Sequence, residues 1–135
     1  MGLYTFRVDG GARELFRPVS PTSTNLQPVM RAARFVEEEV TAKGGALVLD
    51  ADASYQDLQL GFFTGLPDER LVRLRWPDFR ERLEQTRPEY LVRFDEGALV
   101  REPGVALEGR TLTVGGVTYE ELEGFSPPVH VYRRR

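Results

Sequence analysis

The stretch Ala46-Leu47-Val48-Leu49-Asp50-Ala51-Asp52 decides the fold that this sequence predicts. A short run of apolar residues that ends on acidic residues is typical of a strand covered on both faces by helices. Helical patterns are therefore expected before and after it in the chain. We place this strand at the centre of a parallel sheet.

The segment before the strand has the periodicity of an amphipathic helix. Asn25 is a suitable N-cap, Pro28 is tolerated in a first turn, and Gly44-Gly45 can adopt the left-handed conformation that ends helices. We therefore divide the chain into an N-terminal arm with a Pro/Ser/Thr-rich loop (1–24) and a single α/β domain (25–135). The apolar residues that recur at spacings of three and four are Leu26, Val29, Met30, Ala33, Val36 and Val40.

The same unit repeats after the strand. Ser54 and Asp57 resemble a capping box, and strands at 70–75 and 89–94 are separated by a short helix that opens near Trp76. This order favours right-handed crossovers. The predicted fold class is α/β, a three-layer Rossmann-like alternation of helices and strands with a mostly parallel sheet. In the helix after the capping box, one face carries Tyr55, Leu58 and Phe62.

After Asp95 the helical periodicity stops, and glycines separate short β-rich pieces. Residues 110–114 and 117–119 flank Gly115-Gly116, a pair suited to a primed hairpin turn. Residues 129–132 are a plausible last strand. The sequence therefore predicts a C-terminal β-meander that follows the parallel sheet.

Composition excludes several classes of function. The chain has 135 residues, a net charge of -3 and no cysteine. The absence of cysteine removes thiolate catalysis, disulfides and thiolate metal sites. An acidic balance disfavours nucleic acid, whose binding depends on a basic surface. No stretch approaches the roughly 20 apolar residues that a membrane helix requires.

The most suggestive chemical signal is the pair Asp50 and Asp52 at the end of the apolar strand. Haloacid-dehalogenase-type phosphatases and some glycosyltransferases place carboxylates in this way. Such a phosphatase also needs a phosphate-holding cation and a later acidic pair for magnesium, and neither pattern follows here. We therefore interpret both residues as a strand end and helix cap, with a small Asp-dependent phosphohydrolase as an alternative.

The sequence contains no complete catalytic set, so we assign no catalytic residue, no metal site and no cofactor. The single histidine, His130, excludes a multi-histidine metal site. In an open α/β sheet, ligands bind beyond the carboxyl ends of the strands. The aromatic residues beside the strands are expected to fill the core. The candidate ligand-binding residues are Asp50, Asp52, Ser54, Tyr55, Trp76 and Asp95.

Four segments together carry a resemblance to a known family. They read V-M-R-A-A-R-F-V-E-E-E (29–39), G-G-A-L-V-L-D-A-D (44–52), R-P-E-Y-L-V-R-F (87–94) and P-P-V-H-V-Y-R-R (127–134). Their pattern resembles the C-terminal soluble domain of bacterial multi-spanning glycosyltransferases of the dolichyl-phosphate-mannose mannosyltransferase type. The resemblance spans about residues 25–135 and includes no diagnostic motif.

This resemblance implies a non-catalytic accessory domain, extracytoplasmic and tethered to the membrane in a parent enzyme that acts on lipid-linked sugars. The family's catalytic carboxylates lie in loops between membrane helices, so none is carried over to this chain. The implied partner is the membrane portion of the parent protein. A free-standing cytoplasmic binding or interaction module, dimerising through edge strands, remains the alternative.

Overall fold

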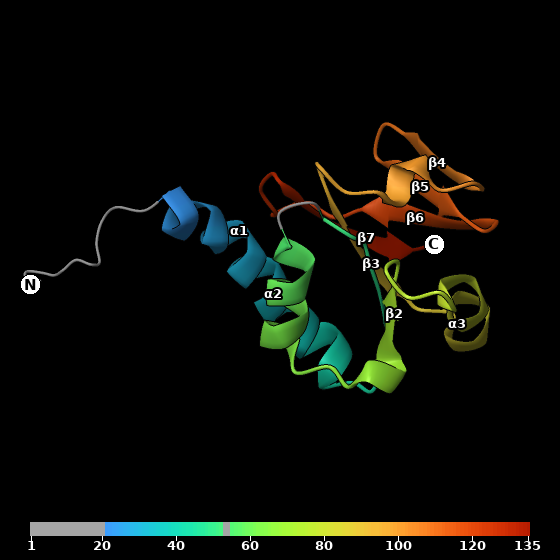
Figure 1. Cartoon of the computed structure of the whole chain (residues 1–135), viewed down its shortest axis with the longest axis horizontal. Coiled ribbons are helices and arrows are strands. Elements are labelled where there is room, and N and C mark those ends of the chain that lie inside the picture. Colours follow the sequence, from blue (N-terminus) through green and yellow to red (C-terminus); the bar gives the residue numbers. More distant parts are fainter. Residues whose placement is uncertain (1–20, 53–54) are drawn as a thin grey trace, which may run out of the picture.

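The computed structural model describes residues 21–52 and 55–135, with side chains described from residue 26 onward. The element order begins with α1 (Pro21–Val36), which continues into a π-helical turn, η1 (Glu37–Thr41). The parallel part of the sheet and its helices follow, and the chain ends in antiparallel strands (Figure 1). Their bounds are β1 (Leu47–Leu49), α2 (Gln56–Thr64), η2 (Asp68–Arg70), β2 (Leu71–Arg73), α3 (Phe79–Thr86), β3 (Tyr90–Phe94), η3 (Leu99–Arg101), β4 (Val105–Glu108), β5 (Thr111–Val114), β6 (Val117–Glu121) and β7 (Val129–Arg134).

The described strands form one seven-stranded sheet in the order β2-β1-β3-β7-β6-β5-β4. β1 lies between β2 and β3 and is parallel to both. β7 pairs antiparallel with β3, and β6, β5 and β4 continue as an antiparallel meander. The antiparallel strands curl over one face of the sheet, on the side where α3 lies (Figure 1).

The predicted Rossmann-like, mostly parallel sheet is therefore wrong. Residues 129–134 do not end a separate meander. They return to the free edge of β3 and pair along its whole length, from Tyr90 with Arg133 to Phe94 with Val129. The sheet is consequently mixed, with four of its seven strands in the antiparallel part. The alternating pattern of β7 made this pairing physically available, because one set of its side chains faces each core.

Helix α1 is present where the periodicity predicts a helix, but it begins at Pro21, before Asn25, so residues 21–24 belong to the helix and not to a loop. The chain after it turns at Gly44, which has a φ of 77°. The side chain of Arg70 stabilises this helix end, since its guanidinium donates to the carbonyl oxygens of Gly45, Val40 and Thr41 at 2.6, 2.8 and 3.1 Å. Cations at helix C-termini also interact favourably with the helix dipole.

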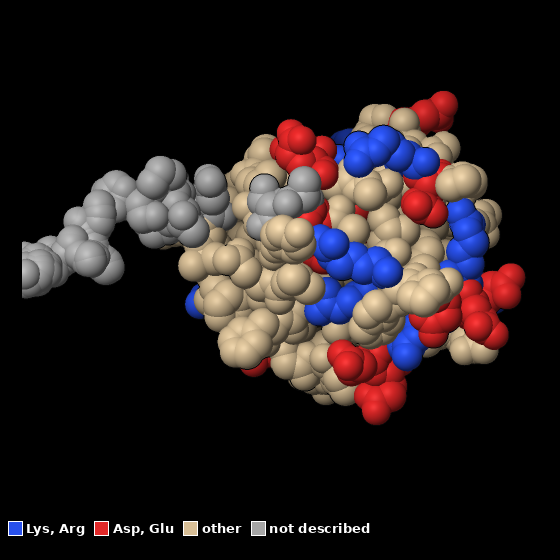
Figure 2. Space-filling model, in the orientation of Figure 1, with Lys and Arg blue, Asp and Glu red and all other residues tan. Residues whose placement is uncertain are grey.

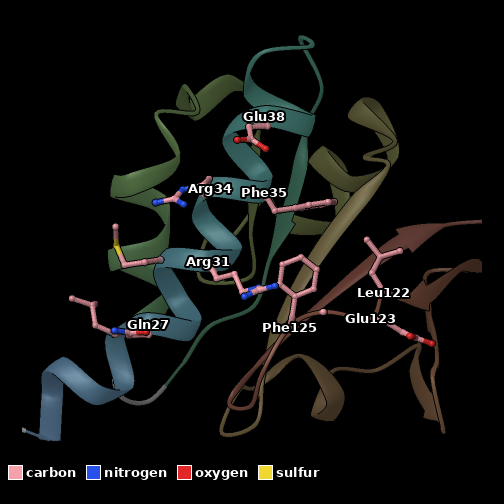
Figure 3. A pocket seen from close by; sticks show the side chains of 11 residues that line it. Gln27, Arg31, Arg34, Phe35, Glu38, Leu122, Glu123 and Phe125 are labelled. Atoms are coloured by element: carbon pink, nitrogen blue, oxygen red, sulfur yellow. The ribbon is translucent and has the colours of Figure 1, made fainter.

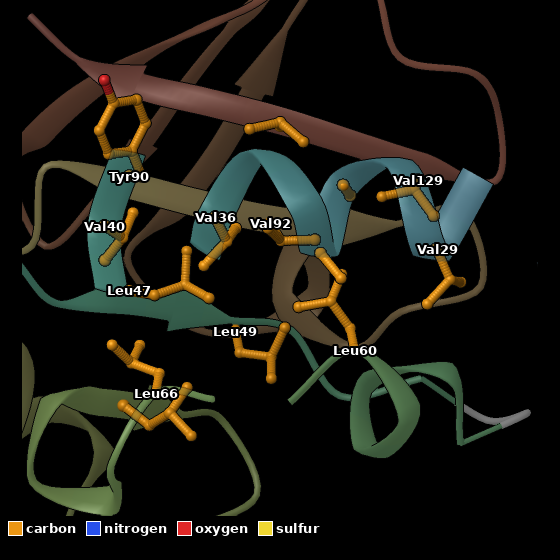
Figure 4. Close-up of a cluster of buried hydrophobic side chains, with 14 of the residues drawn as sticks. Val29, Val36, Val40, Leu47, Leu49, Leu60, Leu66, Tyr90, Val92 and Val129 are labelled. Atoms are coloured by element: carbon orange, nitrogen blue, oxygen red, sulfur yellow. The ribbon is translucent and has the colours of Figure 1, made fainter. Parts of the chain in front are cut away.

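Two hydrophobic cores lie on opposite faces of the sheet. The first packs α1 and α2 against β1, β3 and β7, with Val36, Leu47, Leu60 and Val92 fully buried (Figure 4). The second packs α3 against the other face, under the curled strands, with Leu91, Leu112 and Tyr132 among its members. Both faces of the parallel strands are therefore covered. The carboxyl ends of β1 and β2 lie beside the turn that follows β3.

Candidate functional site

The carboxyl ends of β1 and β2 lie beside the turn between β3 and η3. Asp52 forms an isolated bridge with Gly97 in that turn, and the amide of Ala98 donates to the carbonyl of Ala51 at 2.9 Å. This is the edge where the sequence places ligand-binding residues. Ser54, one of those residues, lies outside the described part of the chain.

Asp50 lies at this edge but is enclosed, with 1% of its surface exposed. Its Oδ2 accepts from the amide of Phe94 at 3.0 Å, and its Oδ1 accepts from the amide of Leu99 at 2.9 Å. A Cβ atom on Gly97 would lie 1.7 Å from Asp50 Oδ2, so only glycine fits there. Burial raises the pKa of the Asp50 carboxyl, and the backbone hydrogen bonds oppose that rise. Asp50 therefore holds the turn after β3 and presents no free oxygen to a ligand.

The carboxylates of Asp52 and Asp57 also accept hydrogen bonds from groups within the protein. The amide of Gln56 donates to Asp52 Oδ2 at 3.2 Å, and the amide of Asp52 donates to Asp57 Oδ1 at 3.2 Å. Two nitrogens of the Arg75 guanidinium donate to Asp57. Nε donates to Oδ2 at 2.7 Å, and a terminal nitrogen donates to Oδ1 at 3.1 Å. This hydrogen bond raises the pKa of the Arg75 guanidinium further. The geometry is that of a cap and a bidentate ion pair.

A small open cavity of about 210 Å³ remains beside these residues. Tyr55, at a φ of 62°, and Arg75 form part of its wall, with the Arg75 guanidinium 5.1 Å from the centre of the Tyr55 ring. Asp52, Glu96 and Arg101 also line it. The structure thus brings Asp52 and Tyr55 together, as the sequence predicts, but around a shallow space with mixed charge.

Trp76 and Asp95 do not line this cavity. Trp76 lies beneath two arginines, with the guanidinium groups of Arg82 and Arg73 at 4.7 and 5.9 Å from its ring centre. Asp95 binds His130 instead: its Oδ1 lies 2.6 Å from Nε2, while Nδ1 lies 2.8 Å from Glu121 Oε2. The sequence gives no sign of this carboxylate-imidazole-carboxylate contact, because Asp95, at the end of β3, meets His130 only through the pairing of β3 with β7.

The cluster around His130 does not extend to a metal site. Within the described residues, no group of three or more His, Cys, Asp or Glu side chains has an arrangement that could hold an ion. We interpret the contact as a link between the ends of β3, β6 and β7.

A larger groove runs along α1. It has a volume of about 970 Å³ and lies between one side of α1 and the segment 122–125 that joins β6 to β7. Arg31 reaches across from α1 toward Phe125, and Arg34 projects on the side where α2 lies (Figure 3). Phe35 closes the floor through edge contacts with Phe125 and Tyr90, at ring distances of 5.2 and 5.4 Å. The groove combines an apolar floor with charged walls.

The outer face of α2 has the opposite character, because its exposed side chains carry no charge and all except Gln59 are apolar. Phe62 is 81% exposed, Tyr55 is 59% exposed and Leu58 is 46% exposed. The only charged residue of the helix, Asp57, is buried. Figure 2 shows this surface as an almost uncharged area, with most of the charged side chains in this view lying to its right. We call Tyr55, Leu58, Phe62 and Phe63 the α2 face.

Comparison with known proteins identifies no relative: no family model, no curated protein and no solved structure matches the chain. Among the described helices, none has the length and apolar composition needed to cross a bilayer. Functional reasoning therefore depends on the surfaces described above.

Proposed function

We propose that this chain is a non-catalytic docking domain of a membrane-embedded glycosyltransferase, and that it docks through the α2 face onto the membrane-embedded part of its parent protein. The observation that carries the proposal is the exposure of Leu58, Phe62 and Phe63, which lie next to one another on an uncharged helix surface. Contiguous apolar surface on a soluble domain marks an interaction site. The type of enzyme comes from the sequence resemblance alone.

The contacts of the carboxylates support a non-catalytic role. Asp50 is enclosed by backbone amides, and Asp57 is held by Arg75. Neither has the access to substrate that a nucleophile or general acid requires. An Asp-dependent hydrolase built on this strand end would need a carboxylate that faces an open cavity. Of Asp50, Asp52 and Asp57, only Asp52 lines a cavity, and its carboxylate already accepts from the amide of Gln56 at the start of α2.

Reading the coding sequence on both sides of this segment is the first test. The proposal requires hydrophobic membrane spans in the same reading frame. An open reading frame limited to these residues would contradict it.

The second test is site-specific crosslinking in the native protein. Because the chain has no cysteine, a Phe62→Cys variant carries one thiol within it, to which a photoactivatable crosslinker can be attached. We expect crosslinks from Phe62→Cys to the membrane spans of the same polypeptide, mapped by mass spectrometry. The matched control is Leu107→Cys, which is also exposed and apolar but lies on β4. Equal yields from both positions, or crosslinks only between two copies, would contradict the proposal.

The groove along α1 favours a second candidate, a free-standing module that binds a polypeptide segment. Its volume of about 970 Å³ and its mixture of apolar and charged walls suit a peptide. Peptides selected on the protein from a display library should lose binding to a Met30→Glu variant and keep it with Leu107→Glu. The homodimer expected from the sequence belongs to this candidate and would pair through β4, the terminal strand of the sheet.

A further inference from the structure

A separate cavity lies on the sheet face that α3 covers. It is enclosed by α3, the turn between β5 and β6, and the end of β7, and it has a volume of about 400 Å³. This size falls within the range of small-molecule sites. None of the candidate residues from the sequence lines it. Helix α3, which forms part of its wall, packs against the face of the sheet opposite to that covered by α2 (Figure 1).

The inner wall of the cavity is apolar. Leu83 of α3, Val117 and Tyr119 of β6, and Pro88 line it. The Tyr119 hydroxyl donates to the Pro88 carbonyl at 2.9 Å, so its polar atom is already paired. Burial raises the pKa of Tyr119 to about 12, and the ring therefore stays neutral at ordinary pH. A flat apolar group would replace water against these side chains.

The rim of the cavity carries an excess of positive charge: three arginines lie there with two glutamates, Glu81 and Glu84. Arg134 donates to the backbone carbonyls of Arg87 and Pro88, which are neutral acceptors, and it forms no ion pair with a side chain in the part of the protein that the structure describes. The Arg87 guanidinium has no side-chain partner within residues 26–52 and 55–135. An anion at the rim would therefore meet two guanidinium groups that form no ion pair with a described carboxylate, Glu81 and Glu84 included.

We propose that this cavity binds a small ligand with a flat apolar body and one anionic group. The apolar body lies against Leu83, Val117 and Tyr119, and the anion faces Arg87 and Arg134. This site is independent of the docking role proposed for α2, because the two surfaces share no residue.

Two fluorescent probes that differ in one sulfonate test both parts of the site. The probes are 8-anilinonaphthalene-1-sulfonate and its uncharged counterpart N-phenyl-1-naphthylamine, titrated into the folded protein. We expect Val117→Phe, which fills the cavity, to abolish the fluorescence increase of both. Arg87→Gln should weaken binding of the sulfonate roughly fivefold and change binding of the uncharged probe by less than about twofold.

Three further variants locate the bound probe. Glu84→Trp, on the exposed surface of α3, should block the cavity mouth without changing the second core. Arg31→Gln removes a similar surface charge at the α1 groove, and Phe62→Ser removes the most exposed apolar side chain of the α2 face. Both should leave binding unchanged. Full binding by Val117→Phe and Glu84→Trp, or a loss confined to Arg31→Gln or Phe62→Ser, would overturn the proposal.

Discussion

Helices α2 and α3 have nearly the same length, lie on opposite faces of one sheet, and distribute their side chains in opposite ways. α3 buries Phe79 and Leu83 and exposes charged residues, as a surface helix of a globular protein does. α2 buries Asp57 together with Leu60, Gly61 and Thr64, and exposes the α2 face. A helix that exposes its aromatic residues while its carboxylate is buried has an outer surface suited to a partner.

The close packing of α2 shows why its inner side accepts so few large residues. A Cβ atom on Gly61 would lie 2.1 Å from a terminal nitrogen of Arg73, which passes beneath the helix. The Thr64 hydroxyl donates to the Gly61 carbonyl at 3.0 Å. Small and polar residues therefore occupy the inner side, around arginines from the end of β2, and Leu60 alone supplies a large apolar side chain to the first core.

The largest expected difference in the free energy of unfolding is between alanine variants of the two leucines of α2. Leu60→Ala should lower the free energy of unfolding by about 3 kcal/mol, because it removes buried methyl groups and leaves a cavity in the first core. Leu58→Ala should change it by less than about 0.5 kcal/mol, because Leu58 already contacts solvent. Urea unfolding followed by circular dichroism measures both. Equal losses would show that the outer side of α2 is packed and would remove the basis of the docking proposal.

The buried carboxylate of α2 gives the next largest effect. Asp57→Ala should cost about 2 kcal/mol, because Asp57 is 1% exposed and its loss leaves Arg73 and Arg75 without their carboxylate. The exposed part of Arg75 limits the loss, since water can solvate it. Glu81→Ala, in the first turn of α3, is the matched control and should change stability by less than about 0.5 kcal/mol. A cost for Glu81→Ala as large as that for Asp57→Ala would contradict this assignment.

The same helix marks where reasoning from the sequence succeeds and where it fails. The spacing of Tyr55, Leu58 and Phe62 correctly places Leu58 and Phe62 on one side of a helix whose N-cap is Tyr55. The expectation that aromatic residues beside the strands fill the core is wrong for Phe62, which is 81% exposed. Periodicity reports which residues share a face and does not say whether the rest of the chain covers it. Arg73 and Arg75, which pair with the inner side of α2, lie at and just after the end of β2, and no local pattern indicates that pairing.

The sheet shows a similar limit. The strand 46–49 and the helix before it follow from local patterns, and both are present. The pairing of β7 with β3 joins residues about 40 positions apart in the chain, and a choice between parallel and antiparallel neighbours depends on contacts of that range. The contact of His130 with Asp95 and Glu121 depends on the same pairing. For that reason, neither the strand pairing nor this contact could be predicted from local sequence patterns.

The smallest expected effect extends the comparison to two buried carboxylates, since Asp57 faces arginines whereas Asp50 is bound mainly by backbone amides. The pKa of Asp50 is raised in the folded protein, with burial as the main cause. Its contribution to stability is therefore fully present below the unfolded-state pKa of about 4 and is lost as pH rises through the folded-state pKa. Across that interval, we expect rising pH to lower the unfolding free energy of the parent chain relative to that of Asp50→Asn. Urea unfolding of both proteins at closely spaced pH values measures this difference. The variant keeps the size of the side chain. Placing an amide opposite the Phe94 and Leu99 amides has a cost that does not change with pH, so the pH dependence reports the ionisation of Asp50 alone. A difference that does not vary with pH would contradict the raised pKa and show that the backbone hydrogen bonds balance burial at Asp50. Variation in the opposite direction would show that these hydrogen bonds outweigh burial.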